Sequence, residues 1–174
     1  MRANGPDFGI DPERIALVGG SSGGHLATML GVVPDADGAT HGGVRGIVAI
    51  NPLLDPVYFA GHRIWSDEYQ IVIDWAPLFG VAYAEMPELW HVAQPLGYVS
   101  EDDPPFLIVH GAEDRTLPIA QIEPVRAALE RTGVRVEFVV NEGGKHDMLN
   151  GSVFYDVLER MERFLTQVLK DAGT

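Results

Sequence analysis

A strand–turn–helix pattern near the start of the chain constrains the fold more than any other feature. Residues 15–18 read Ile-Ala-Leu-Val, an apolar run typical of a buried strand, and a glycine-rich stretch at residues 19–24 follows directly. Apolar residues then recur at helical spacing over residues 26–33. The pattern Gly-x-Ser-x-Gly between a strand and a helix is typical of a nucleophile elbow, a tight turn that presents a serine at its tip.

Two overlapping frames fit this elbow: residues 19–23 are centred on Ser21, and residues 20–24 are centred on Ser22. Because we expect the strand to end at Val18, the earlier frame is favoured and Ser21 is the predicted nucleophile. We expect glycine two positions before and after the serine because side chains there would collide. A phosphate-binding loop is the other interpretation, but the Lys-Ser/Thr pair of that signature does not follow the glycines.

Composition narrows the class of protein. The 174 residues suit one domain spanning 1–174, and 46% hydrophobic residues are enough for a sizeable core. A net charge of −13 disfavours nucleic acid and anionic membrane as partners. The chain has no cysteine, so disulfides, thiolate chemistry and cysteine metal sites are excluded. The polar N-terminal residues have no apolar core of a signal peptide and no apolar run is long enough to span a membrane, so we expect a cytoplasmic location.

Apolar runs alternate along the chain with helical patterns, which predicts an α/β fold with a parallel sheet. The expected strands are residues 14–18, 46–50, 106–110 and 134–140, and the expected helices are residues 22–33, 87–91, 119–131 and 152–170. Pro124 should kink the third helix or delay its start, and Gly133 should end it. Residues 51–95 are long, aromatic and dotted with proline, so we interpret them as a cap-like or pocket insertion, with extra core packing as the alternative.

An activated serine needs a base, and the base needs an acid that orients it. Asp114 follows the strand at residues 106–109, four positions before a proline, and His146 follows a glycine-rich loop after the next strand. Both positions are at the carboxyl ends of parallel strands, where open α/β sheets place functional groups. Ser21, Asp114 and His146 are therefore the predicted nucleophile, acid and base, with Glu113 as the alternative acid.

The other histidines are better explained by structure than by chemistry. His110 is interpreted as a strand-end packing residue, and His25 as a structural residue in the first helix. His41 begins a His-Gly-Gly sequence, but it follows the nucleophile, so a plain turn is favoured. His62 and His91 lack ligand spacing, and we predict neither a metal site nor a cofactor.

Several segments together resemble the α/β-hydrolase superfamily, in its esterase/lipase branch related to hormone-sensitive lipases and to xylan- or feruloyl-esterase-like proteins. The matching segments are Phe-Gly-Ile-Asp-Pro-Glu-Arg-Ile at residues 8–15, the elbow at 19–27, residues 103–111 with Asp114 and Pro118, and Gly-Lys-His at 144–146. The resemblance implies Ser21 as nucleophile, His146 as base, Asp114 as acid and the Ser22 backbone N–H as an oxyanion donor.

Members of that superfamily carry a long segment before the Phe-Gly-Ile-Asp-Pro sequence, with the first strands and a His-Gly-Gly-type oxyanion loop. We therefore expect a truncated, minimal α/β-hydrolase fold of about four parallel strands in sequential order, with helices on both faces. Helices 22–33 and 152–170 should share one face, with 119–131 opposite. Loss of one oxyanion donor typically costs about 10²–10³ in rate, so turnover should be weak.

The strand at residues 14–18 would form an open apolar edge in such a fold, and open edges pair with other chains. We expect a homodimer through this edge or the faces beside it. The predicted function is a serine carboxylesterase that hydrolyses small carboxylic esters. The alternatives are a nearly inactive, self-assembling hydrolase-fold fragment with a vestigial triad, and an amidase or peptidase on the same three residues.

Overall fold

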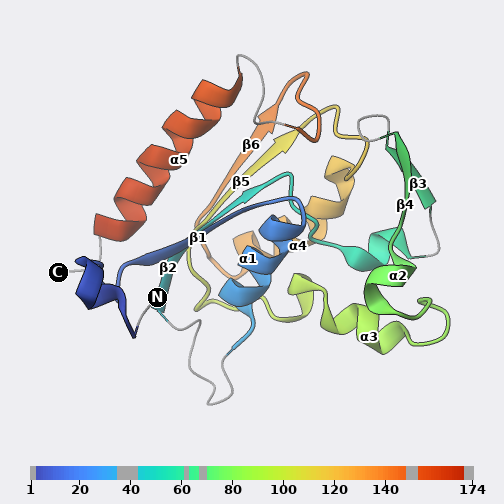
Figure 1. Ribbon diagram of the computed structural model, residues 1–174, viewed down its shortest axis with the longest axis horizontal. Coiled ribbons are helices and arrows are strands. Elements are labelled where there is room, and N and C mark those ends of the chain that lie inside the picture. The colour runs from blue at the N-terminus through green and yellow to red at the C-terminus, as the bar shows by residue number, and fades with distance from the viewer. Residues whose placement is uncertain (1–2, 35–42, 61–62, 67–69, 148–152, 171–174) are drawn as a thin grey trace.

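The computed structural model describes residues 3–34, 43–60, 63–66, 70–147 and 153–170. Its centre is a parallel sheet of four strands in the order β1-β2-β5-β6. The strands are β1 (Ile15–Gly20), β2 (Val44–Ile50), β5 (Phe106–Gly111) and β6 (Val136–Asn141). The sequential order confirms the predicted fold class, with β1 at one edge and β6 at the other (Figure 1).

The strand register brings the carboxyl ends of all four strands to one rim of the sheet. Gly20 pairs with Ile50, Ile50 pairs with Val109, and Val109 pairs with Val139. β1 runs through Gly20, two residues beyond its predicted end, because Gly19 and Gly20 continue the ladder with β2. β5 is buried at every position, as expected of a strand covered on both faces.

The expected distribution of helices over the two faces is wrong. α1 (Ser22–Val32) and α4 (Glu123–Arg131) share one face, and α5 (Val153–Lys170) covers the other (Figure 1). Right-handed crossovers explain this, because successive strands that advance in one direction across a sheet place their connecting helices on the same face. α5 follows the last strand, makes no crossover, and is free to cover the opposite face.

Two cores result, because successive side chains of a strand point to opposite faces. One core joins α1 and α4 to the sheet through Ala27, Val32, Val125, Leu129, Ile47, Phe106 and Ile108. The other joins α5 to the sheet through Val157, Phe164, Val168, Val48, Leu107 and Val109.

The third predicted helix begins as a 3₁₀ turn, η5 (Ile119–Ile122), and becomes α4 only at Glu123. Pro124 lies in the first turn of α4, where its missing N–H is not needed, so the proline delays the α-helix as predicted. Gly133 follows the helix with φ of +82°, the left-handed geometry of a terminating glycine.

Residues 51–95, called the excursion below, connect β2 to β5 through several short elements. The excursion contains η3 (Pro56–Phe59), the hairpin strands β3 (Arg63–Ser66) and β4 (Ile71–Asp74), α2 (Ala76–Phe79) and α3 (Pro87–Val92); η4 (Pro95–Gly97) follows, and η1 (Gly5–Phe8) precedes β1. The hairpin was not predicted. A small core of Leu53, Phe59 and Leu117 packs the excursion against the loop after β5, away from β1 (Figure 1).

The β1 edge is open in the described part of the chain. Within the described ranges, β1 pairs only with β2. Val18 is 50% exposed there, and Leu26 and Leu30 of α1 are 62% and 66% exposed. Among the described helices, none is long and apolar enough to cross a membrane.

Candidate active site

Ser21 lies at the tip of the turn between β1 and α1, in a backbone conformation that residues other than glycine rarely adopt. Its φ is 54° and its ψ is −122°, and a positive φ is uncommon for a residue other than glycine. The Ser21 N–H donates to the Ile50 carbonyl at 2.9 Å, and the Ser21 carbonyl accepts from the N–H of His25 at 3.1 Å and of Leu53 at 3.4 Å. The end of β2 and the first turn of α1 therefore fix the serine.

The collision expected of side chains around Ser21 is confirmed two positions before the serine but not two positions after it. A Cβ on Gly19 would lie 2.1 Å from the Gly23 carbonyl oxygen, and one on Gly24 would lie 2.9 Å from Pro52. A Cβ on Gly23 would meet nothing within 4 Å, so the predicted collision two positions after the serine is wrong. Gly23 is already in α1, where its Cβ position faces open space.

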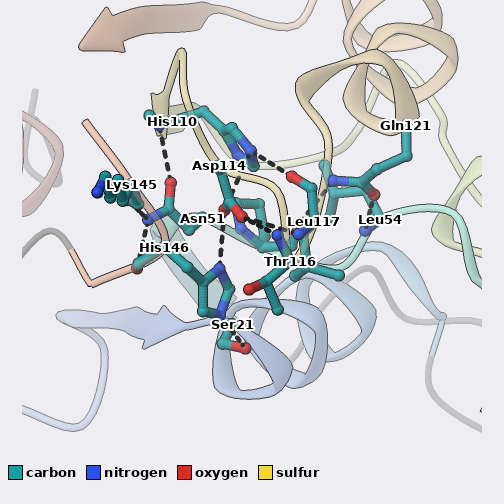
Figure 2. A network of polar contacts seen from close by, with 12 residues as sticks. Ser21, Asn51, Leu54, His110, Asp114, Thr116, Leu117, Gln121, Lys145 and His146 are labelled. Carbon is teal, nitrogen blue, oxygen red and sulfur yellow. Dashed lines mark hydrogen bonds and ion pairs between the residues drawn. The ribbon is translucent and has the colours of Figure 1, made fainter. Parts of the chain in front are cut away.

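His146 lies between Ser21 and Asp114 (Figure 2). Its Nε2 is 2.9 Å from Ser21 Oγ, and its Nδ1 is 2.7 Å from Asp114 Oδ2. Because an ionised carboxylate only accepts hydrogen bonds, Nδ1 is the donor, and Nε2 of the neutral ring accepts from the serine hydroxyl. This is the arrangement by which a histidine withdraws a proton from a nucleophilic hydroxyl.

Hydrogen bonds to both oxygens hold the Asp114 carboxylate in place. Its Oδ1 accepts the N–H of Thr116 at 2.9 Å and of Leu117 at 2.8 Å, which leaves Oδ2 for His146. Glu113, the alternative acid, is exposed. Ser66 of β3 hydrogen-bonds Thr116 at 3.0 Å between their hydroxyl oxygens, so the excursion at 51–95 supports the loop that carries Asp114.

His110 and His25 lie close to these residues without contacting Ser21 Oγ in the described hydrogen bonds. His110 is fully buried, and its Nε2–H donates to the Leu117 carbonyl at 2.8 Å and lies 3.5 Å from Asp114 Oδ2. Burial lowers the pKa of His110, against an opposing effect of the Leu117 carbonyl and Asp114. Burial also lowers the pKa of His25, whose Nδ1 bonds the Leu53 carbonyl at 2.9 Å. Each of the two histidines thus bonds a backbone carbonyl, which agrees with the structural interpretation.

The expected oxyanion donor, the backbone N–H of Ser22, lies at the start of a helix. Ser22 is the first residue of α1, and the first N–H groups of a helix have no acceptor within the helix. The positive end of the helix dipole adds to the field at this point. The Ser22 side chain is exposed.

Ser21 and His146 border an open cavity of about 470 Å³. Most of its lining is apolar and comes from the end of β1 and from α5: Val18, Gly19, Gly20, Ser21, Ile50, His146, Asp147, Phe154, Val157, Leu158 and Met161. None of the described residues within 51–95 lines this cavity, and the cap-like role of the segment stays a prediction.

The remaining predicted residues lie elsewhere. His91 contacts Tyr83 and Gln94 on the excursion, and His41 and His62 fall outside the described residues. One buried polar residue at the site was not singled out from the sequence: Asn51, whose amide contacts the backbone of His146. An asparagine after a strand carries no motif that would have revealed it.

The comparisons with known proteins give the family. The BD-FAE family model matches residues 1–129, a span that includes Ser21 and Asp114 and ends before His146. The chain belongs to the BD-FAE family. This confirms the predicted α/β-hydrolase esterase relationship.

Individual relatives agree with this family. Esterase LipQ of Mycobacterium tuberculosis is 30% identical over 137 residues, which are 76% of this chain and 32% of LipQ. Esterase LipC of the same organism is 28% identical over 96% of this chain and 43% of LipC. The butyrate-bound structure of esterase Est2 from Thermogutta terrifontis superposes with a TM-score of 0.71 at 25% identity, covering 96% of this chain and 61% of Est2. The chain thus spans less than half the length of LipQ and of LipC.

Proposed function

We propose that this chain carries the nucleophile, base and acid of a serine carboxylic ester hydrolase. The observation that carries the proposal is the position of His146, 2.9 Å from Ser21 Oγ and 2.7 Å from Asp114 Oδ2. Membership of a family that includes esterases supports an ester as the substrate. The apolar cavity beside Ser21 suits a small acyl or alkoxy group.

In the proposed reaction, Ser21 Oγ attacks the ester carbonyl carbon while its proton passes to His146 Nε2. The negative charge that forms on the carbonyl oxygen faces the Ser22 N–H. The carbon–alkoxy bond then breaks, the alcohol leaves with the proton from His146, and an acyl group remains on Ser21. Water repeats the attack through His146, releases the carboxylic acid and restores the serine. Asp114 stabilises the imidazolium in both halves of the cycle.

Covalent labelling by a fluorophosphonate probe, with the labelled peptide mapped, tests the proposal. The organophosphate paraoxon phosphorylates Thermogutta terrifontis esterase 2, a structural neighbour at 25% identity, and the same chemistry should modify Ser21 here. Ser21→Ala should abolish labelling and lower the hydrolysis of p-nitrophenyl acetate at least about 10³-fold. Ser22→Ala keeps the backbone N–H and should retain most of both. Labelling on Ser22 would move the nucleophile, and no labelling would favour the inert, self-assembling module.

We also propose that a second copy of this chain pairs with β1 to form a homodimer. The outer backbone groups of β1 have no strand partner in the described part of the chain, and exposed apolar residues flank them. An edge strand of this kind pairs readily with its own copy about a two-fold axis. Sedimentation equilibrium at micromolar concentration should give a dimer mass, and a well-folded monomer would contradict the proposal.

A further inference from the structure

Asn51 occupies an unusual position at the end of β2. It is 1% exposed, and its φ is 42°, in the left-handed region that asparagine tolerates better than most residues. All the hydrogen-bonding atoms of its side-chain amide face backbone. Oδ1 accepts the Gly111 N–H at 2.9 Å, and Nδ2 donates to the carbonyls of Lys145 at 3.0 Å and His146 at 2.6 Å (Figure 2).

These partners belong to the segments that carry the proposed acid and base. Gly111 ends β5, and its carbonyl accepts the Asp114 N–H at 3.2 Å. The His146 carbonyl belongs to the base itself. The residue before Asn51 completes the arrangement, because the Ile50 carbonyl accepts the Ser21 N–H at 2.9 Å. The end of β2 therefore bonds all three segments that meet at the site.

The chemistry of these contacts requires an amide. One acceptor and two donor hydrogens in a single plane match one N–H and two carbonyls. Aspartate is the same size and also accepts from Gly111, but it has no donor, and its charge would face two carbonyl oxygens. Glycine would preserve the positive φ and leave the Gly111 N–H without its acceptor, which destabilises a buried group.

We propose that Asn51 is a positioning residue for His146. Its amide holds the His146 backbone at the distance from β2 that sets the separation of His146 Nε2 and Ser21 Oγ. In the described hydrogen bonds, Asn51 contacts no reacting atom and acts through backbone groups of the segments that carry the base and the acid. The inference rests on the proposed function of Ser21 and His146. Displacement of a reacting group by about 1 Å costs on the order of 10²-fold in rate, so an anchor of this kind has a measurable effect.

A matched pair of substitutions tests the proposal. Gln121 is also a buried amide: its Oε1 accepts from Leu54 at 2.7 Å and Asp55 at 3.1 Å, and its Nε2 donates to Pro52 at 2.8 Å. Asn51→Asp and Gln121→Glu make the same chemical change, but only the first affects the His146 loop. Gln121→Glu measures the general cost of replacing a buried amide with a carboxylate.

For p-nitrophenyl acetate, Asn51→Asp should lower kcat about 10²-fold and change KM less than about 2-fold. Asn51→Gly, which carries no charge, should show the same loss of kcat with little change in KM. This variant keeps the test available if the aspartate variant does not fold. Gln121→Glu should keep kcat within about 3-fold at a comparable loss of Tm. The proposal is overturned if Asn51→Asp and Gln121→Glu lose kcat equally at equal losses of Tm. It is also overturned if kcat is unchanged in the Asn51 variants.

A spectroscopic readout separates this proposal from the proposed function. The Nδ1 proton that His146 shares with Asp114 should give a resolved, downfield proton resonance in the wild type and in Gln121→Glu. That resonance should be lost or broadened by exchange in Asn51→Asp and Asn51→Gly. If the wild type neither labels nor hydrolyses, the proposed function fails while this comparison still reports on Asn51. A resonance that persists unchanged in the Asn51 variants would show that the residue does not position His146.

Discussion

The two sides of Ser21 differ sharply. On the side of β2, β5 and β6, Asp114 is 5% exposed, His146 is 8% exposed, and each makes hydrogen bonds that fix it. On the side of β1, Val18 and Leu158 are 50% and 40% exposed, and the cavity beside the serine is open. The described residues therefore fix the proposed acid and base, whereas they leave the cavity beside Ser21 open on the side of β1.

The largest expected effect on activity is at Asp114, on the side of Ser21 that faces β2, β5 and β6. Asp114→Asn keeps an acceptor for the Thr116 and Leu117 N–H groups but presents an NH₂ group to His146 Nδ1, which forces the wrong tautomer. We expect kcat/KM for p-nitrophenyl acetate to fall about 10²–10⁴-fold with little change in Tm. Asp74→Asn, on the exposed hairpin, is the control and should leave kcat/KM unchanged. A small effect of Asp114→Asn would reject Asp114 as the acid.

The second comparison concerns stability, and it is between Gly19 and Gly23 on the two sides of Ser21. Gly19→Ala places a Cβ against the Gly23 carbonyl and should lower the free energy of unfolding by about 2–3 kcal/mol. Gly23→Ala adds a methyl group to a helical position with open space and should raise it by about 0.5–1 kcal/mol. Urea denaturation measures both. Similar losses in the two variants would mean that both sides of the elbow are equally packed.

The third expectation concerns pH. Burial lowers the pKa of His110 below the value of about 6.5 that an unfolded chain has. The unfolded state then binds more protons at and below that pH, so stability should fall as the pH is lowered from about 6.5 toward the folded-state pKa. The loss per histidine is at most about 1.4 kcal/mol per pH unit. His110→Gln should flatten the pH dependence of the urea midpoint, and a parallel dependence would contradict this role.

The smallest expected effect on stability is at the exposed leucines of α1, on the side of β1. Leu26→Gln and Leu30→Gln change residues that are 62% and 66% exposed, and each should alter the unfolding free energy by less than about 0.5 kcal/mol. Leu129→Ala, at a fully buried position, should cost about 2–5 kcal/mol by the same measurement. A large loss at Leu26 in dilute solution would show that this face is covered. If β1 is the dimer interface, the two glutamine variants should weaken dimerisation.

Local patterns predicted the four strands and the order of Ser21, Asp114 and His146 because apolar runs and glycine turns are short-range signals. The shared face of α1 and α4 was missed, although it follows from the direction of the crossovers once the strand order is known. The hairpin of β3 and β4 lies in a stretch without clear alternation. Asn51 could not be found, because its importance depends on backbone atoms 60 and 95 residues away in the sequence.

The hydrogen bond between Ser21 and His146 also links the site to the folding reaction. Its two residues are 125 positions apart, so the bond closes only after the intervening strands have assembled. During synthesis Ser21 is made before His146, which follows the last described strand of the sheet. If Ser21 is the nucleophile as proposed, its reactivity toward an organophosphate should follow the completion of folding, and the rate at which that reactivity appears after dilution from denaturant should report the last step of sheet assembly.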